Sequence, residues 1–231
     1  WCYYNVGEYG KAIDTMKSVV SYSQAAAQGG DKKKLTLYDE ALKDLVRFFA
    51  DAGEMNEAYD YFSRLGKKEL IYKMLKRLGR MYFEQGKFEQ AIETYRRLIT
   101  EEPQSPAAPD YQNEIIQAYR RMGAKDQVLS EIDRLLRDYG KSSSWARANS
   151  ADQDAVNEAS RYVEKALREV ALGYHQEARK LGTGRQAKET YILAEKAYRK
   201  YVVEFPSGKY TYDMRFSFGE ILWELKNYPE A

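Results

Sequence analysis

The sequence has little of the chemistry on which most catalytic and metal sites depend. Cys2 is the only cysteine and His175 the only histidine in the 231 residues. One cysteine excludes an intramolecular disulfide and a cysteine-rich zinc site, and one histidine excludes a His-Glu-x-x-His motif. The chain also contains neither a G-x-S-x-G turn nor a G-x-x-x-x-G-K-[ST] phosphate loop. We therefore expect a protein that is not an enzyme and that uses no metal and no cofactor.

Long apolar runs and a net charge of one sign are also missing. No apolar stretch approaches the ~20 residues that span a bilayer, so we expect no membrane span. The 37 Lys and Arg residues nearly balance the 35 Asp and Glu residues. A nucleic-acid-binding domain normally carries a clear basic excess, so we expect no nucleic-acid partner. A hydrophobic fraction of 44% is too high for a disordered chain.

Strand patterns are nearly absent, and the five prolines stand between apolar stretches rather than inside them. Apolar residues recur instead at the i, i+3, i+4, i+7 spacing of an amphipathic helix. Glycine precedes a predicted helix by two residues at four places, where a helix C-cap favours a left-handed backbone: Gly7, Gly53, Gly86 and Gly123. The sequence predicts helices near 1–6, 9–27, 35–52, 55–65, 68–85, 88–101, 107–122, 125–139, 151–181, 186–204 and 209–226.

A spaced set of large, small and aromatic residues repeats along these helices. The clearest copy contains Leu75, Leu78, Gly79, Tyr82, Gly86, Phe88, Ala91, Tyr95, Leu98 and Pro103. The same spacing returns in 42–65, and weaker copies occupy most of the chain. The pattern resembles the tetratricopeptide repeat, a helix–turn–helix unit of about 34 residues. Because one unit cannot bury its apolar face alone, such units stack into a solenoid.

The resemblance implies an all-α, right-handed superhelical solenoid of antiparallel helix pairs over 1–231. The repeated alanine position is spaced by 46, 33, 37, 66 and 37 residues, so we expect one enlarged repeat, with insertions near 140–154 and 178–187. Lys32–Lys34 is expected in a loop. The predicted repeats are 1–30 (truncated), 35–66, 68–103, 107–140, 151–206 (enlarged) and 209–231 (truncated).

The C-terminal third carries a narrower resemblance. The segments Tyr198–Tyr201, Phe205–Tyr210 and Phe218–Glu220 are similar to the repeat subtype found in bacterial periplasmic and outer-membrane lipoproteins. This implies a non-catalytic adaptor in a cell-envelope assembly, periplasmic or attached to the outer membrane. The alternative is a cytoplasmic scaffold, or the regulatory portion of a larger protein whose effector domain lies elsewhere. Neither end resembles a natural terminus, so we expect a segment of a longer chain.

In the tetratricopeptide repeat family, first-helix residues that avoid the packing set line a concave groove. The resemblance implies that they bind a protein or peptide partner, which we expect to be acidic, and it leaves the oligomeric state open. The alternative is that each charged side chain lies on a solvated helix face and binds no partner. Carried onto this sequence, the groove positions are Lys43, Arg47, Lys73, Lys76, Arg80, Phe83, Asn113, Gln117, Arg120, Phe216 and Trp223. His175 is expected at the surface or in the groove, and the repeat assigns packing roles to Tyr3, Tyr9, Tyr82, Tyr95, Tyr119, Tyr174, Tyr198 and Tyr228.

Overall fold

The computed structural model describes residues 1–27, 32–66 and 68–227. Within these residues the ordered elements are helices, and no strand occurs among them, which confirms the all-α prediction. The chain divides into two compact units, Trp1–Ala124 and Lys125–Ala231. The division falls between the two helices of the predicted repeat 107–140. The repeat boundaries and the right-handed superhelical path stay predictions.

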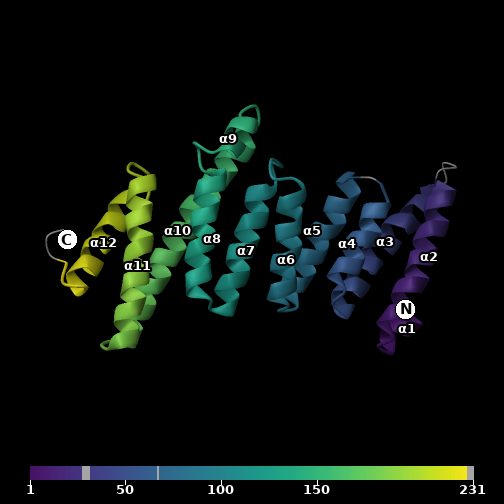
Figure 1. The fold of residues 1–231 in the computed structure, drawn as a ribbon, viewed down its shortest axis with the longest axis horizontal. Coiled ribbons are helices and arrows are strands. Elements are labelled where there is room, and N and C mark those ends of the chain that lie inside the picture. The colour runs from purple at the N-terminus through teal and green to yellow at the C-terminus, as the bar shows by residue number, and fades with distance from the viewer. Residues whose placement is uncertain (28–31, 67, 228–231) are drawn as a thin grey trace. The chain divides into compact units, whose positions relative to one another are not determined.

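The first unit is a row of helices in which neighbours along the chain pack side by side (Figure 1). The longer helices α2 and α3 pack against each other, α3 and α6 both contact α5, and α6 also contacts α7. Almost all helix bounds agree with the prediction within one residue. The helices are α1 (Cys2–Asn5), α2 (Tyr9–Ala27), α3 (Lys32–Ala52), α4 (Met55–Arg64), α5 (Lys68–Glu84), α6 (Phe88–Glu101) and α7 (Ala108–Met122).

Two turns show why glycine stands between paired helices. Gly86 and Gly123 adopt φ values of 73° and 70°, a left-handed conformation that residues with a Cβ rarely take. The Gly123 amide donates to the Arg120 carbonyl, 3.1 Å away, and so satisfies an acceptor at the end of α7. The chain then begins its next helix two residues later, as the spacing predicts.

A continuous core runs through the first unit from α2 to α7. Tyr82 is fully buried, and its hydroxyl donates to the Phe49 carbonyl at 3.3 Å. Lys87 donates through Nζ to the Ala50 carbonyl at 2.5 Å, so side chains from one repeat cap the helix end of the previous one. These contacts couple adjacent helix pairs, which is the source of stability in a stacked array.

The tyrosine assignments hold for some positions and fail for others. Tyr82, Tyr95, Tyr174 and Tyr198 are buried, as the packing roles require. Tyr9 and Tyr119 are half-buried, and Tyr228 lies outside the described residues. Tyr3 is 45% exposed, so its assignment to the packing set is wrong. It lies on the four-residue helix α1, where Lys11 places its ammonium 5.6 Å from the ring centroid.

The loop expected at Lys32–Lys34 is also wrong. The backbone of α3 is already helical at Lys32, so this basic triplet forms the first turn of a 21-residue helix. Propensity explains the result, because lysine is a good helix former and no proline or glycine follows before Gly53. Residues 28–31 lie outside the described part of the chain.

The second unit contains the predicted enlarged repeat. Its longest element, α10, has 29 residues and packs along α11, which in turn contacts α12 (Figure 1). Helix α8 contacts both α9 and α10. No helix in the described parts of either unit combines the length and apolar character that crossing a membrane requires. The bounds are α8 (Lys125–Tyr139), α9 (Ser144–Ala148), α10 (Gln153–Leu181), α11 (Arg185–Glu204) and α12 (Thr211–Glu224).

The insertion near 140–154 contains a short helix that the sequence pattern did not predict. Ser143 begins α9 as an N-cap, its hydroxyl accepting from the Ala146 amide at 3.0 Å. Trp145 is only 1% exposed and meets Tyr139 edge to face, with ring centroids 5.6 Å apart. The insertion therefore extends the hydrophobic core of the second unit rather than forming a solvated loop.

His175 is buried, so its expected surface or groove position is wrong. It is 5% exposed, its Nδ1 lies 3.2 Å from the Tyr198 hydroxyl, and its buried Nε2 has no hydrogen-bond partner. The ring also lies edge to face with Tyr191 of α11. Burial, with the nearby Arg179 charge, lowers the pKa of His175, although the carboxylates of Glu220 and Glu224 act in the opposite direction.

This burial predicts an acid-sensitive fold. A histidine whose pKa is lowered by folding stabilises the protein above its ordinary pKa of 6.5. That contribution is lost as the pH falls through 6.5 toward the lowered value, because the unfolded chain then binds more protons. We expect the melting temperature of the second unit to decrease as the pH is lowered from about 8 to about 5. His175→Phe removes the titrating ring and should flatten this slope; an unchanged slope would contradict the assignment.

Candidate functional site

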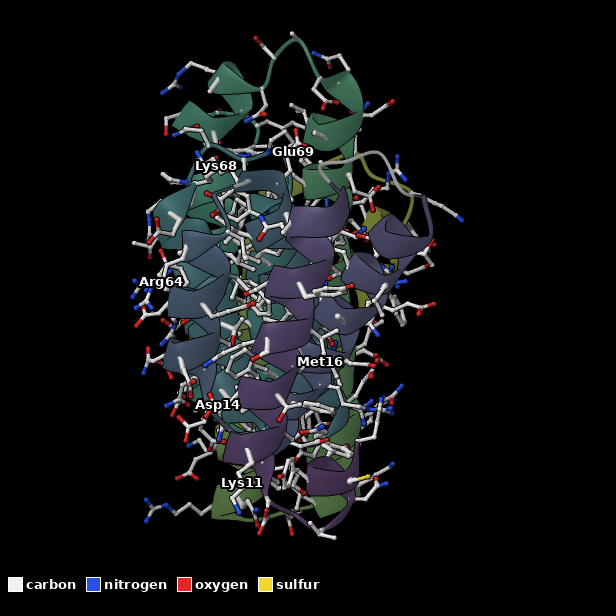
Figure 2. The ribbon with its side chains drawn as sticks, turned by 90° about the vertical axis from the view of Figure 1, so that its right-hand side faces the viewer. Lys11, Asp14, Met16, Arg64, Lys68 and Glu69 are labelled. Atoms are coloured by element: carbon white, nitrogen blue, oxygen red, sulfur yellow. The ribbon has the colours of Figure 1, made fainter. Side chains whose placement is uncertain are left out.

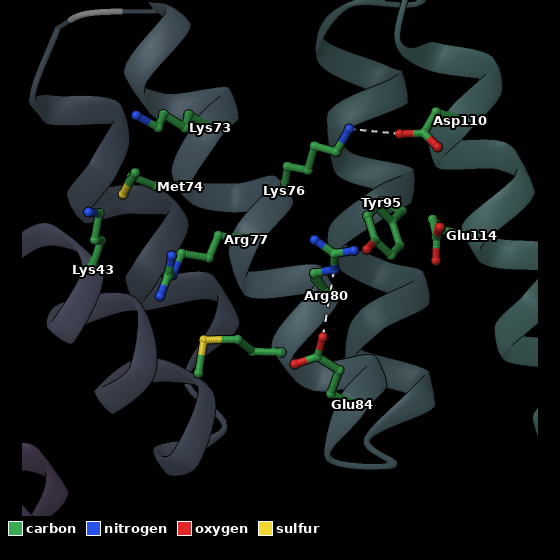
Figure 3. Close-up of a pocket in the computed structure, with 11 residues that line it drawn as sticks. Lys43, Lys73, Met74, Lys76, Arg77, Arg80, Glu84, Tyr95, Asp110 and Glu114 are labelled. Carbon is green, nitrogen blue, oxygen red and sulfur yellow. Dashed lines mark hydrogen bonds and ion pairs between the residues drawn. The ribbon is translucent and has the colours of Figure 1, made fainter. Parts of the chain in front are cut away.

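The candidate site is a groove in the first unit, centred on α5, which we call the α5 groove. It encloses about 600 Å³ and is open to solvent (Figure 3). Its lining comes from four helices, α3, α5, α6 and α7, and includes five cationic and three anionic side chains. The lining residues are Lys43, Lys73, Met74, Lys76, Arg77, Arg80, Met81, Glu84, Tyr95, Asp110 and Glu114.

Tyr95 of α6 gives the groove an aromatic wall. A Cβ on Gly79 would lie 3.0 Å from the Tyr95 Cζ, so glycine lets the ring pack directly against the α5 backbone. On α7, Tyr111 stacks with Tyr95 at a centroid distance of 6.0 Å. Burial raises the pKa of the Tyr95 phenol, which therefore stays neutral over the physiological range. The ring fixes the relative positions of α5, α6 and α7.

The side of the groove toward α3 is basic. Figure 3 shows Lys43, Lys73 and Arg77 on this side, which we call the basic side. All three side chains are exposed, and within the described residues no ion pair or hydrogen bond involves them. Because like charges are clustered without a partner, a bound acidic group gains attraction without first breaking an existing ion pair.

The side of the groove toward α7 carries Asp110 and Glu114, and we call it the acidic side (Figure 3). The Lys76 Nζ lies 2.7 Å from the Asp110 Oδ2. Burial acts to lower the pKa of Lys76, but this hydrogen bond and the Asp110 charge outweigh it, so the pKa is raised and the ammonium persists. Burial, assisted by the Asp110 charge, raises the pKa of the half-buried Glu114 carboxyl.

The structure brings four predicted groove residues together: Lys43, Lys73, Lys76 and Arg80 all line the α5 groove. Arg47 and Phe83 do not line it. The Arg47 guanidinium lies over the Trp1 ring, 5.9 Å from its centroid. The Phe83 ring is half-buried and packs edge to face on Phe88 at 5.5 Å, because it faces the second helix of its own repeat.

Helix α7 contributes different residues from those predicted. Asn113, Gln117 and Arg120 do not line the groove, and Arg120 instead donates to Gln117 at 3.3 Å. The predicted groove positions form a single stripe along each first helix. A gap between two helices is lined by the facing sides of both, so α7 adds Asp110 and Glu114, and α5 adds Arg77 toward α3. The repeat spacing identifies equivalent positions on successive helices, but it does not specify which sides of α5 and α7 face each other.

The two predicted aromatic residues of the second unit lie on α12. Phe216 is 66% exposed and Trp223 is 65% exposed, and Tyr212, one turn before Phe216, is also exposed. At helical spacing these three residues share one face, opposite the side on which Met214 and Ile221 are buried. The aromatic side chains are accessible, but they belong to a different unit from the α5 groove.

The first unit also carries exposed cationic side chains outside the α5 groove. Lys11 on α2 and Arg64 on α4 are exposed, and both are labelled in Figure 2. Lys11 pairs with Glu8 one turn away at 2.9 Å, a solvated arrangement worth about 0–1 kcal/mol. In the described chain, no group of three or more His, Cys, Asp or Glu side chains is arranged to hold a metal ion. The cluster of exposed charged side chains suits the open α5 groove to binding.

Comparison with known proteins gives one family match. Residues 77–105 match the family model described as tetratricopeptide repeat. The matched segment overlaps the clearest sequence copy and covers the C-terminal part of α5, from Arg77 to Glu84, and all of α6, and it supports the resemblance to this superfamily. No curated protein sequence matches the chain. Among solved structures, the chain is similar to "Crystal structure of BtubC (BKLC) from P. vanneervenii", at 12% identity and a TM-score of 0.31, covering 94% of this chain and 92% of that chain.

Proposed function

We propose that this chain, in which residues 77–105 match the tetratricopeptide repeat, is a protein-interaction scaffold that binds an acidic peptide segment in the α5 groove. The observation that carries the proposal is the basic side, where Lys43, Lys73 and Arg77 have no ion pair or hydrogen bond within the described residues and lie beside the partly exposed Met81. The tetratricopeptide repeat is typically a protein-binding module, so its role here is binding rather than catalysis.

The chemistry of the groove supports this choice of ligand. A charge-assisted hydrogen bond contributes roughly 1.5–3 kcal/mol, about twice a neutral one. Two or three such bonds from the basic side total at most about 9 kcal/mol before the cost of ordering the peptide is subtracted, so about 1 μM is the tightest dissociation constant expected. An extended segment is favoured over a folded domain because the groove is open and only about 600 Å³ in volume.

The biological setting remains part of the proposal. Similarity of the C-terminal third to bacterial envelope proteins supports a periplasmic or outer-membrane-attached adaptor in a multiprotein assembly. A cytoplasmic scaffold, or the regulatory portion of a larger protein, is the alternative. Fractionation of the native source with an antibody against this chain separates these two settings.

Reversal of the basic side tests the proposed ligand. In Lys43→Glu/Lys73→Glu, attraction for an acidic peptide becomes repulsion at two positions. We expect the affinity for a synthetic peptide of about ten residues rich in Asp and Glu to fall at least about tenfold. Fluorescence anisotropy of the labelled peptide measures this change, and circular dichroism verifies that the helix content is retained.

Lys11→Glu/Arg64→Glu is the matched control, since it changes the net charge equally at exposed sites away from the groove. Its affinity should stay within about twofold of the unaltered protein, as expected for screened charges at a distance. Equal losses in the two variants would show a non-specific charge effect. A folded groove variant with unaltered affinity would rule out the α5 groove as the peptide site.

A further inference from the structure

The α5 groove consists of two gaps with different charge character. Between α3 and α5, Lys43 faces Lys73 and Arg77, and the charges are all positive (Figure 3). Between α5 and α7, Lys76 and Arg80 face Asp110 and Glu114, and opposite charges meet. A ligand that was acidic along its whole length would be attracted in the first gap and repelled by carboxylates in the second.

Glu114 is the acidic side chain of the second gap whose neighbouring cations are paired elsewhere. Asp110 is occupied by Lys76, at 2.7 Å, and Arg80 pairs with Glu84 through Nε at 3.6 Å. For Glu114 the described residues provide no ion pair or hydrogen bond, although its side chain is half-buried in the groove lining. The charges of Arg80 and Lys76 act on the Glu114 carboxyl without pairing with it, so its oxygens are available to accept hydrogen bonds from a cationic ligand group.

We propose that the α5 groove selects a peptide segment with separated charges, with its acidic residues against Lys43, Lys73 and Arg77 and a lysine or arginine against Glu114. The proposal rests on the proposed peptide-binding function and adds a requirement that a purely acidic ligand does not meet. The charge order of the groove then determines the direction in which a given segment lies across α5.

The spacing of the ligand charges follows from helix geometry. Packed helices lie about 8–10 Å apart, so the centres of the two gaps are separated by roughly one such distance. An extended peptide advances about 3.3 Å per residue, so about three residues bridge the gaps. The matching segment therefore has a short acidic run, about two uncharged residues, and then one basic residue.

A double-mutant cycle with synthetic peptides tests the pairing. The first peptide has this pattern with a lysine, and the second replaces that lysine with glutamine. We expect the replacement to weaken binding about tenfold with the unaltered protein, but less than about twofold with Glu114→Gln. Glu93→Gln, which neutralises an exposed carboxylate on α6 outside the groove lining, should retain the full tenfold effect.

Charge exchange provides a second measurement, should Glu114→Gln fold poorly. A peptide with glutamate in place of the lysine should bind Glu114→Lys more tightly than it binds the unaltered protein. Equal peptide preferences in the unaltered protein and Glu114→Gln, or no rescue by the exchange, would overturn the charge-separation proposal. If both peptides bind but Lys43→Glu/Lys73→Glu leaves their affinity unaltered, the proposed function itself fails.

Discussion

Trp145→Ala should lower the free energy of unfolding of the second unit by about 3–5 kcal/mol, the usual loss when a buried aromatic side chain is removed from a core. Trp145 is 1% exposed and fixes α9 against Tyr139. Its removal leaves a cavity that α9, with five residues, is too short to close by repacking. Hydrogen exchange at the amides of α8 and α10 measures the loss, with amides of α3 as an internal reference.

Trp223→Ala is the matched control in the same unit. Trp223 is 65% exposed, so its truncation should alter the free energy of unfolding by less than about 0.5 kcal/mol. If the two alanine variants exchange their amides at the same rates, then the insertion at 140–154 does not belong to the core.

Gly79→Leu should destabilise the first unit by about 2 kcal/mol. The added Cβ alone would lie 3.0 Å from the Tyr95 Cζ, and Tyr95 is only 2% exposed, so its ring has little space to retreat. Overpacking of this kind costs about 3 kcal/mol, while the better helix propensity of leucine offsets about 1 kcal/mol. The displaced ring should also weaken binding in the α5 groove. Hydrogen exchange at α5 and α6 amides measures the first effect.

The control for this substitution is Gly173→Leu. Gly173 lies in the interior of α10, where no atom stands within 4 Å of a built Cβ. We expect this variant to gain up to about 1 kcal/mol from helix propensity. If both leucine variants were more stable than the unaltered protein, the packing of the Tyr95 ring would not require glycine at position 79.

Much of the fold follows from local sequence. The range 125–139 was predicted for the helix observed as Lys125–Tyr139, because glycine and the repeat spacing mark both of its sides. The short helix α9 was missed because five residues are too few to show a periodic pattern. The burial of His175 was missed for another reason, since it depends on the Tyr191 and Tyr198 rings of α11, which pack against the imidazole.

Some residues of the candidate site could be predicted from the sequence and others could not. Lys43, Lys73, Lys76 and Arg80 were predicted because repeat positions transfer between strong copies. Asp110 and Glu114 were not, because the set of residues in a gap depends on which sides of two helices face each other. That orientation is set by contacts distant in sequence, such as the stacking of Tyr95 on Tyr111. A one-helix pattern contains no information about them.

The most direct test of the peptide site uses the methionine methyl groups. The chain has six methionines, of which Met74 and Met81 line the α5 groove and Met214 lies in the second unit. In NMR spectra of protein labelled with ¹³C at the methionine methyl groups, titration with the charge-separated peptide should shift the Met81 and Met74 signals and leave Met214 in place. Saturable shifts confined to Met214, or no shifts in any methionine at peptide concentrations well above about 1 μM, would contradict binding in the α5 groove.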